Sequence, residues 1–375
     1  MNILYLTSVD PRKTDYGGQQ RSHAIWEGLK TIGNVCVVRP VPSLKHEDWD
    51  ESSGVYYICF DKRYSLSWFI RRMWGMFFPE LTIGCGISLS PLKKLCRNFD
   101  LVVVQTLKVV GYLRPWRIAT MYVDIDDTPT TDYALAHPKR LLRLFLLRKW
   151  QEAMSKKAEL LWVPDSRQIN DFTNRRVCLL PNIPSQMHNI SENESLGDRL
   201  LFVGYLSHPP NQVALDWFLH NFWEKVNARF RSLKFSIVGG GLPERYKIEW
   251  GKYPNVELLG FVDDLEQVYK EARVMIAPMR TGSGTCIKVL ESLAHGVPVI
   301  ATAQGLRGID EANRTVVNGI YQFDDEVTLI EALLNVLALS KPSRGAMQFI
   351  RTNYSQAMVG NALLHSIKNN DVACR

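Results

Sequence analysis

The chain has 375 residues, of which 46% are hydrophobic and 22% are charged. This length predicts two domains, and the composition argues against disorder and against a coiled coil. The formal net charge of +7 comes from residues 1–180, which hold 26 lysines and arginines against 18 aspartates and glutamates. The first half is therefore expected to meet an anionic partner.

The cysteines and the apolar segments indicate a cellular location. None of the seven cysteines forms a CxxC pair or has a histidine at zinc-finger spacing, so we expect free thiols in a reducing compartment. The N-terminal run MNILYLTSVD lacks a basic region and predicts a first strand, not a signal peptide. The longest apolar run, residues 66–78, is too short to span a bilayer and contains Arg71 and Arg72. These features predict a cytoplasmic protein, with a peripheral position at the inner face of the membrane as a further possibility.

Strands alternate with helices through the first half. Apolar runs of strand length occur at residues 2–8, 35–41, 54–60, 101–107, 120–126, 160–166 and 177–183. A short helical stripe ends at Gly33, and residues 140–159 form an amphipathic helix. This alternation predicts a parallel, doubly wound sheet.

A second α/β series follows a polar linker. Residues 181–198 are rich in Asn, Ser and Pro and have no apolar period, as is typical of an interdomain segment. Strands are then predicted at 200–206, 233–241, 255–262 and 273–279, with helices at 211–230 and 263–272. The apolar face of the first of these helices is expected at Val213, Trp217, Phe218, Phe222 and Val226. The predicted domains are 1–180 and 199–345. Helices are predicted in 346–375, and their return to the first domain is left open.

The segment APMRTGSGTCIKVLESLAHGVPVIAT, residues 277–302, has the pattern strand, glycine turn, helix and strand. A glycine turn before a helix that starts near Thr285 exposes backbone N–H groups that suit a phosphate. Gly284, Lys288, Glu291 and His295 share one face of that helix. The carboxylate of Glu291 can accept both ribose hydroxyls while Lys288 neutralises a diphosphate. The alternative is an exposed helix face with a Lys–Glu pair.

This segment resembles the donor-binding motif of glycosyltransferase family 4 and its GT-B-fold relatives, in the sub-branch that reads P-x-R-x-G-G-G-T-x-x-K-x-L-E. Further resemblances lie in LLFVGYLSHPPNQVALDWF, IVGGGLP, NVELLGFVDDL and LLPNI, and together they cover most of the chain. The resemblance implies a GT-B fold, that is, two doubly wound Rossmann-like domains that face each other across a cleft. It implies an N-terminal acceptor domain and a C-terminal donor domain.

The resemblance also implies roles for single residues. Glu291 matches the family glutamate that holds the ribose, and Ser283 stands where the sugar-binding glutamate would be. The expected donor-binding residues are Gly17, Gly18, Phe261, Arg280, Gly282, Ser283, Gly284, Thr285, Lys288 and Glu291. Arg280, Thr285 and Lys288 are the expected pyrophosphate contacts, and Lys288 would also stabilise the leaving diphosphate in catalysis. The co-substrate would be a nucleotide-diphosphate sugar, with no other cofactor and no metal.

Aspartates gather in YVDIDDTPTTDY, at the end of an apolar strand. They could hold a divalent metal as a DxD motif, or they could serve as helix caps and turn formers. The second doubly wound half argues against the metal fold. We therefore expect Asp126 or Asp127 to act in the cleft, by hydrogen bonds to sugar hydroxyls or by acid–base help.

Basic residues alternate with aromatic residues in KRYSLSWFIRRMWGMFF, residues 62–78. Such a pattern suits an anionic membrane surface or single-stranded nucleic acid, and a partly buried amphipathic helix with a solvated rim is the alternative. Because this is the half expected to bind the acceptor, we favour a membrane-bound or lipid-linked acceptor over nucleic acid.

The predicted function is that of a retaining glycosyltransferase, a hexosyltransferase of class EC 2.4, acting on a saccharide or lipid-linked acceptor in cell-surface polysaccharide or glycoconjugate synthesis. Retention is implied by the resemblance. Two alternatives remain open: a GT-B-fold nucleotide-sugar 2-epimerase, and a non-catalytic protein that binds nucleotide sugars or nucleic acid. No GxGxxG follows the first strand, which disfavours an NAD-dependent enzyme.

Overall fold

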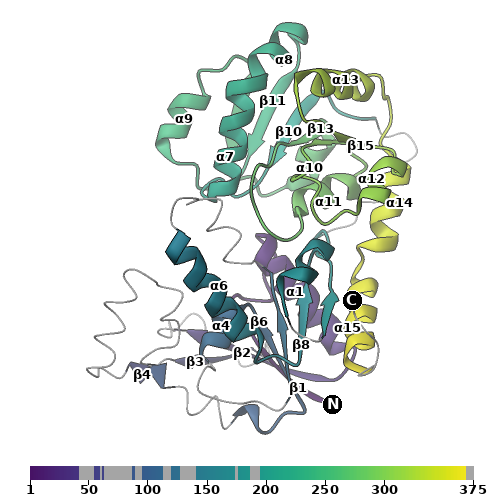
Figure 1. Cartoon of the computed structure of the whole chain (residues 1–375). Coiled ribbons are helices and arrows are strands. Elements are labelled where there is room, and N and C mark those ends of the chain that lie inside the picture. The colour runs from purple at the N-terminus through teal and green to yellow at the C-terminus, as the bar shows by residue number, and fades with distance from the viewer. Residues whose placement is uncertain are drawn as a thin grey trace. The chain divides into compact units, whose positions relative to one another are not determined.

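The computed structural model describes residues 1–41, 55–59, 61–62, 87–88, 95–112, 120–126, 141–173, 176–185 and 195–368. The chain divides into two compact units (Figure 1). Unit 1 contains Met1–Asn182 and Gln356–Arg375, and unit 2 contains Ile183–Ser355. The C-terminal segment therefore belongs to the unit that the N-terminus begins.

The described residues of unit 1 form a parallel sheet of seven strands, in the order β3-β2-β1-β6-β7-β8-β9. Strands β1, β6, β7 and β8 are buried almost throughout, as parallel strands covered on both faces should be. The strands are β1 Asn2–Leu6, β2 Asn34–Val41, β3 Val55–Cys59, β6 Leu101–Gln105, β7 Met121–Asp124, β8 Leu160–Val163 and β9 Val177–Leu179. A short antiparallel pair joins β4 Asp61–Lys62 to β5 Ile87–Ser88.

The helices of unit 1 include one from the far end of the chain. The helical segments are α1 Gly17–Lys30, α4 Leu107–Tyr112, α6 Leu141–Ser155, the 3-10 helix η4 Ser166–Asp171 and α15 Gln356–Lys368. Helix α15 lies beside α1, where the Gln356 side chain donates to the backbone oxygen of Ala24 at 2.8 Å. The Trp162 indole of β8 also donates to the Ser366 hydroxyl at 3.0 Å. The C-terminal helix is thus part of the unit 1 core.

Unit 2 repeats the architecture with a parallel sheet of six strands, in the order β12-β11-β10-β13-β14-β15. The strands are β10 Arg199–Val203, β11 Lys234–Val238, β12 Val256–Gly260, β13 Ala272–Ala277, β14 Val299–Ala301 and β15 Ile320–Gln322. The prediction of two doubly wound, Rossmann-like α/β halves is therefore confirmed.

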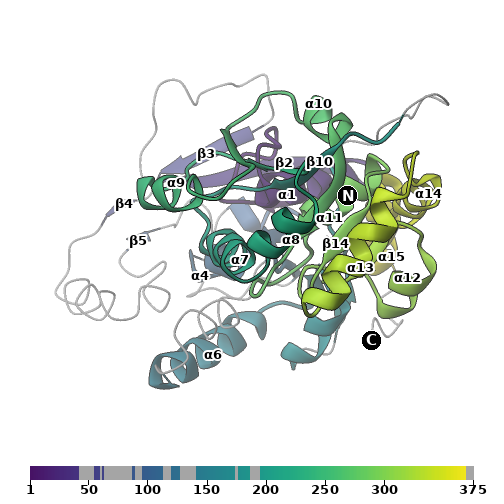
Figure 2. The same cartoon turned by 90° about the horizontal axis from the view of Figure 1, so that it is seen from above.

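The helices of unit 2 cover both faces of its sheet. They are α7 Pro209–Phe218, α8 Glu224–Arg229, α9 Glu244–Trp250, α10 Leu265–Lys270, α11 Ile287–Ala294, α12 Glu311–Val316, α13 Glu326–Leu337 and α14 Arg344–Asn353. Helices α7, α8 and α13 follow one another along one side (Figure 2), where the Phe218 and Phe222 rings pack edge-on against Phe323 at 6.5 and 5.7 Å. On the other side, α11 packs against α14.

The helix predicted at 211–230 differs from the structure in two ways. It begins at Pro209 and is interrupted by a π-helical turn, η5, over Leu219–Trp223. Val213, predicted on the apolar face, is 46% exposed, because Ala214 and Leu215 are the residues that turn toward the core. The prediction is wrong at Val213 only: Phe218, Phe222 and Val226 are buried, and Trp217 packs against the core.

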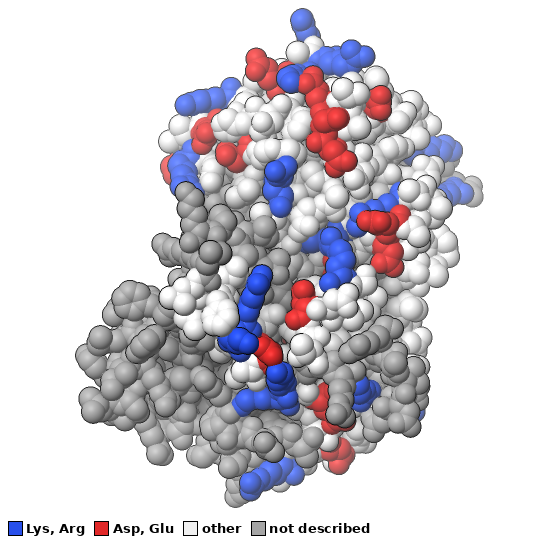
Figure 3. Space-filling view, viewed as in Figure 1, with Lys and Arg blue, Asp and Glu red and all other residues white. Residues whose placement is uncertain are grey.

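Several predicted features lie outside the described residues. They include Asp127 and most of the basic and aromatic segment 62–78. Over the upper part of the face in Figure 3, which is unit 2, basic and acidic side chains are interspersed, as expected of a half with balanced charge. Among the described helices, none is long and apolar enough to cross a bilayer.

Candidate functional site

The carboxyl ends of the strands of unit 2 carry the glycine clusters of the sequence. Parallel strands end at one edge of a sheet, and ligands of doubly wound sheets bind there. At this edge the loop after β11 lies against the loop after β10, since the Leu206 amide donates to the Gly240 oxygen at 2.8 Å. Gly239 has φ +148°, and a Cβ on it would lie 1.8 Å from the Gly204 oxygen. Only glycine permits these loops to approach so closely.

The loop between β13 and α11 is held by the segment that follows β14. The Gln304 side chain donates to the Gly282 oxygen at 2.6 Å, and the Arg307 Nε donates to the Ser283 oxygen at 3.2 Å. Gly282 has φ +122°, and a Cβ there would lie 3.0 Å from the Arg307 guanidinium. The Cys286 amide returns a hydrogen bond to the Arg307 oxygen at 3.2 Å. Arg307 and Gln304 therefore shape the turn, although the sequence reasoning did not identify them.

Helix α11 begins at Ile287, two residues later than predicted, with Cys286 as its N-cap. Thr285 is buried beside Gly308, not at the start of the helix. The first turn of α11 contains no acidic residue. The positive end of its dipole is thus not neutralised by a carboxylate within that turn, which favours an anion at this end.

Lys288 lies in the first turn of α11 and is half-buried. Its Nζ donates to the Asn211 side-chain oxygen at 2.8 Å and lies 3.7 Å from the centre of the Phe202 ring. Burial lowers the pKa of this ammonium group to about 7, and nearby Arg307 acts in the same direction. The lysine is thus a partly desolvated cation that an anionic ligand would stabilise.

Glu291 is one turn further along α11 and is 7% exposed. Its Oε2 accepts from the hydroxyl of Tyr269 at 3.4 Å, and its Oε1 accepts from the hydroxyl of Ser185 at 3.1 Å. Burial and the adjacent carboxylate raise the pKa of Tyr269 well above its usual value, so this hydroxyl remains a donor. His295 stacks on Tyr269 with ring centres 4.4 Å apart. The polar face predicted on α11 is thus covered at Glu291 and His295, because side chains from other segments pack on it.

Two further predicted donor residues lie at the exposed rim of unit 2. The Arg280 guanidinium sits over the Trp217 ring, 4.6 Å from its centre. Phe261 is 72% exposed and follows β12, and its Cβ would lie 3.6 Å from a Cβ placed on Gly240. Both residues follow carboxyl ends of strands, as do Lys288 and Glu291.

In unit 1 the predicted residues surround a buried ion pair. Gly17 and Gly18 begin α1, and a Cβ on Gly18 would lie 3.5 Å from the Asp126 carboxylate. Beneath them, the Arg21 Nε donates to both carboxylate oxygens of Asp124 at 3.0 and 2.9 Å. Asp126 Oδ1 lies 3.9 Å from the same Nε. The structure thus brings Gly18 and Asp126 together, and the second predicted aspartate lies outside the described residues.

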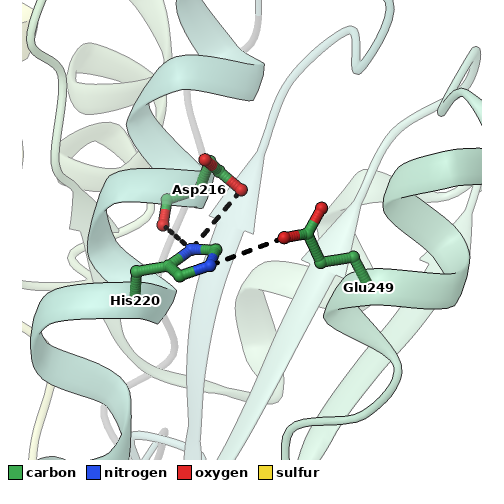
Figure 4. A group of neighbouring side chains, drawn as sticks. All are labelled: Asp216, His220 and Glu249. Carbon is green, nitrogen blue, oxygen red and sulfur yellow. Dashed lines mark hydrogen bonds and ion pairs between the residues drawn. The ribbon is translucent and has the colours of Figure 1, made fainter.

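A third cluster lies on α7, η5 and α9 of unit 2 (Figure 4) and contains Asp216, His220 and Glu249. The two ring nitrogens of His220 face different carboxylates: Nδ1 lies 3.5 Å from Asp216 and Nε2 lies 3.5 Å from Glu249. Nδ1 also contacts the Asp216 backbone oxygen at 2.9 Å. His220 thus links Asp216, on the same helical run, to Glu249 on α9.

Three comparisons bear on the class of protein. Residues 197–338 match the family model of the glycosyl transferases group 1. An uncharacterized 44.6 kDa protein in the cps region of Klebsiella pneumoniae is 25% identical over 177 residues, and the match covers 44% of each chain. HepE of Anabaena, solved in complex with UDP and glucose, has a TM-score of 0.67 at 12% identity and covers 98% of this chain and 100% of its own. WaaG, a glycosyltransferase involved in lipopolysaccharide biosynthesis, has a TM-score of 0.58 at 16% identity, and the match covers 98% of this chain and 95% of WaaG.

Two Rossmann-like sheets with this likeness to HepE and WaaG define the GT-B class of fold. Within that class, residues 197–338 are similar to the glycosyl transferases group 1 family. The chain spans less than half of the length of its Klebsiella relative.

Proposed function

We propose that the chain is a retaining glycosyltransferase that moves a sugar from a nucleotide-diphosphate donor to a saccharide or lipid-linked acceptor. The arrangement of Lys288 and Glu291 on α11 carries this proposal. A desolvated ammonium group lies one helical turn from a carboxylate, at the strand ends of a domain similar to the glycosyl transferases group 1 family. This spacing suits the diphosphate and the ribose of one nucleotide.

The remaining groups of unit 2 fit the other parts of a donor. The backbone amides of the loop at Gly282–Thr285 and the N-terminus of α11 would bind phosphate oxygens. Arg280 would add a second cation, and the exposed ring of Phe261 offers an apolar surface at the rim. As the diphosphate leaves, Lys288, Arg280 and the helix dipole would stabilise its growing negative charge.

In unit 1, Gly17 and Gly18 are proposed donor-binding groups, and Asp126 is a proposed catalytic group. Asp126 is half-buried at the end of β7, beside the first turn of α1. It could accept hydrogen bonds from sugar hydroxyls. Asp127 shares this proposed role on the basis of the sequence pattern, and no metal is assigned to either residue.

Acceptor class is inferred from the relatives. One relative is encoded in a cps region, and WaaG acts in lipopolysaccharide biosynthesis. These contexts support a role in cell-surface polysaccharide synthesis, and the basic excess of residues 1–180 supports a site at an anionic membrane.

Vesicles with anionic phosphatidylglycerol should therefore co-sediment more of the chain than neutral vesicles do, and equal co-sedimentation would remove the membrane proposal.

The direct test of the proposed function is a panel of UDP-, GDP- and ADP-sugars, scored by thermal shift and then by nucleotide release with saccharide and lipid-linked acceptors. A bound donor should raise the melting temperature by mass action. NMR of the product then reports whether the anomeric configuration is retained. If a donor binds but no acceptor causes nucleotide release and the donor is not inverted at C2, the chain is a non-catalytic binding protein. If the donor is inverted at C2 without an acceptor, the chain is an epimerase.

Replacing Glu291 by alanine should lower donor affinity about tenfold, because a hydrogen bond to a charged group contributes about 1.5–3 kcal/mol. Isothermal titration with the best donor of the panel measures the change. Glu331→Ala, on the exposed face of α13, is the matched control and should bind normally. Glu291→Gln keeps an acceptor for the Tyr269 hydroxyl and should therefore stay folded, so a loss of affinity in this variant is a loss of binding and not of folding. Unchanged donor affinity in both Glu291 variants would refute the ribose assignment.

A further inference from the structure

The two oxygens of the Glu291 carboxylate have different surroundings. Oε2 faces Tyr269, which is 2% exposed and lies in the unit 2 core. Oε1 faces the hydroxyl of Ser185, which is an exposed residue. Oε1 is thus bound by an exposed residue, whereas Oε2 is bound by a residue of the core.

The position of Ser185 follows from its place in the chain. It lies close to the start of unit 2, which begins at Ile183. It is 106 residues away from Glu291 in sequence. The contact at 3.1 Å is thus a tertiary hydrogen bond to a carboxylate, and such charge-assisted bonds are stronger than neutral ones.

We propose that Ser185 occupies the position of a ribose hydroxyl on Glu291, and that a nucleotide must displace it to bind. The inference rests on the proposed function, since it takes Glu291 as the ribose acceptor. A hydroxyl donor on one carboxylate oxygen is the interaction that a ribose O–H would make at the same place. Ser185 is then an affinity-determining residue that weakens nucleotide binding by competition.

Because Ser185 competes with the nucleotide, its removal should strengthen nucleotide binding, whereas most substitutions in a binding site weaken it. Removing the hydroxyl in Ser185→Ala takes one donor away from Oε1, so the ribose no longer has to break that hydrogen bond. We expect UDP, GDP or ADP, whichever binds the wild type, to bind this variant about threefold to tenfold more tightly. Inorganic pyrophosphate has no ribose, and its affinity should not change.

Isothermal titration of the full chain with UDP, GDP, ADP and pyrophosphate tests the proposal. Ser232→Ala, at an exposed turn of unit 2, is the matched control. In a Glu291→Ala background, Ser185→Ala should have no effect, because the competed group is absent.

The measured affinities distinguish the role of Ser185 from the proposed function itself. Nucleotide affinity that is unchanged or weaker in Ser185→Ala overturns the displacement, and so does an equal gain for pyrophosphate. If none of the three nucleotides binds the wild type, the proposed function fails and this inference fails with it. If nucleotides bind and Glu291→Ala weakens them while Ser185→Ala does not tighten them, only the role of Ser185 is refuted.

Discussion

Replacement of Lys288 by methionine should lower donor affinity about a hundredfold and, at the same time, raise the melting temperature of the ligand-free chain. The loss of affinity follows because Lys288 would contact diphosphate oxygens through charge-assisted hydrogen bonds, each of about 1.5–3 kcal/mol. The gain in stability follows because a half-buried ammonium group loses its hydration and methionine does not. Residues that serve binding often cost stability in this way.

Donor affinity should fall while the melting temperature of the ligand-free chain rises, so the two effects can be told apart. Isothermal titration with a nucleotide sugar and thermal unfolding without ligand measure the two effects separately. Lys270→Met, at an exposed position of α10 paired with Glu266 at 2.8 Å, is the matched control and should change neither quantity appreciably. A variant that keeps its donor affinity would refute the role of Lys288, and a variant that loses affinity by unfolding would show a lower melting temperature.

The same lysine predicts a pH dependence. Its pKa of about 7 means that the charged form predominates below pH 7 and is lost above it, so donor affinity should fall as the pH rises from 7 to 9. In the unfolded chain the pKa returns to its ordinary value of 10.5, and the unfolded state binds more protons between these two values. Wild-type stability should therefore rise with pH in that window relative to Lys288→Met. An affinity that declines equally in Lys288→Met would assign the dependence to another group.

The donor segment shows which parts of such a site local sequence can predict. Lys288 and Glu291 are three residues apart on one helix, so helical periodicity alone places them on one face. The glycine turn and the strand before it are also local signals. The central strands of both sheets were predictable for a related reason: parallel strands covered on both faces are apolar throughout. The short strand β15, Ile320–Gln322, was not predicted.

The residues that complete the site come from distant segments. Arg307 and Gln304 shape the turn at Gly282 from beyond the next strand, and Tyr269 reaches Glu291 from the helix before β13. Nothing in the spacing of these residues indicates such contacts, because they depend on which loops meet at the sheet edge. For the same reason the sequence predicted Glu291 on a polar face, whereas the structure covers it.

Replacement of Asp124 by alanine should destabilise unit 1 by about 3–5 kcal/mol, because it leaves a buried arginine charge without its partner. Asp124 is 0% exposed and Arg21 is 2% exposed. Burial alone would lower the pKa of Arg21, but the adjacent carboxylate of Asp124 raises it, so the guanidinium stays charged. Chemical denaturation of the full chain, followed by tryptophan fluorescence to which the buried Trp150 and Trp162 of unit 1 contribute, measures the loss.

The ion pair also orders the segment beside Gly17, Gly18 and Asp126, the proposed site residues of unit 1. The same guanidinium donates to the Leu180 oxygen at 2.9 Å and to the Asn182 side chain at 2.6 Å, where the first segment of unit 1 ends. A chain that loses Asp124 should therefore also lose protection from hydrogen exchange at the start of α1, where Gly17 and Gly18 lie. Binding of the nucleotide part of the donor to Lys288 and Glu291 should survive in any Asp124→Ala chain that remains folded, since these two residues belong to the other unit.

Two variants separate the buried charge from a general effect of losing an aspartate. Asp165 is also buried, at 4% exposure, but its partner Arg167 has a side chain 51% exposed, so Asp165→Ala strands no buried charge. It removes the cap of η4 and should cost about 1 kcal/mol. The double variant Arg21→Met/Asp124→Leu removes both charges and should recover part of the stability lost in Asp124→Ala. A cost in Asp124→Ala no larger than that of Asp165→Ala would mean that the arginine is hydrated and that this pair does not anchor α1 to the sheet.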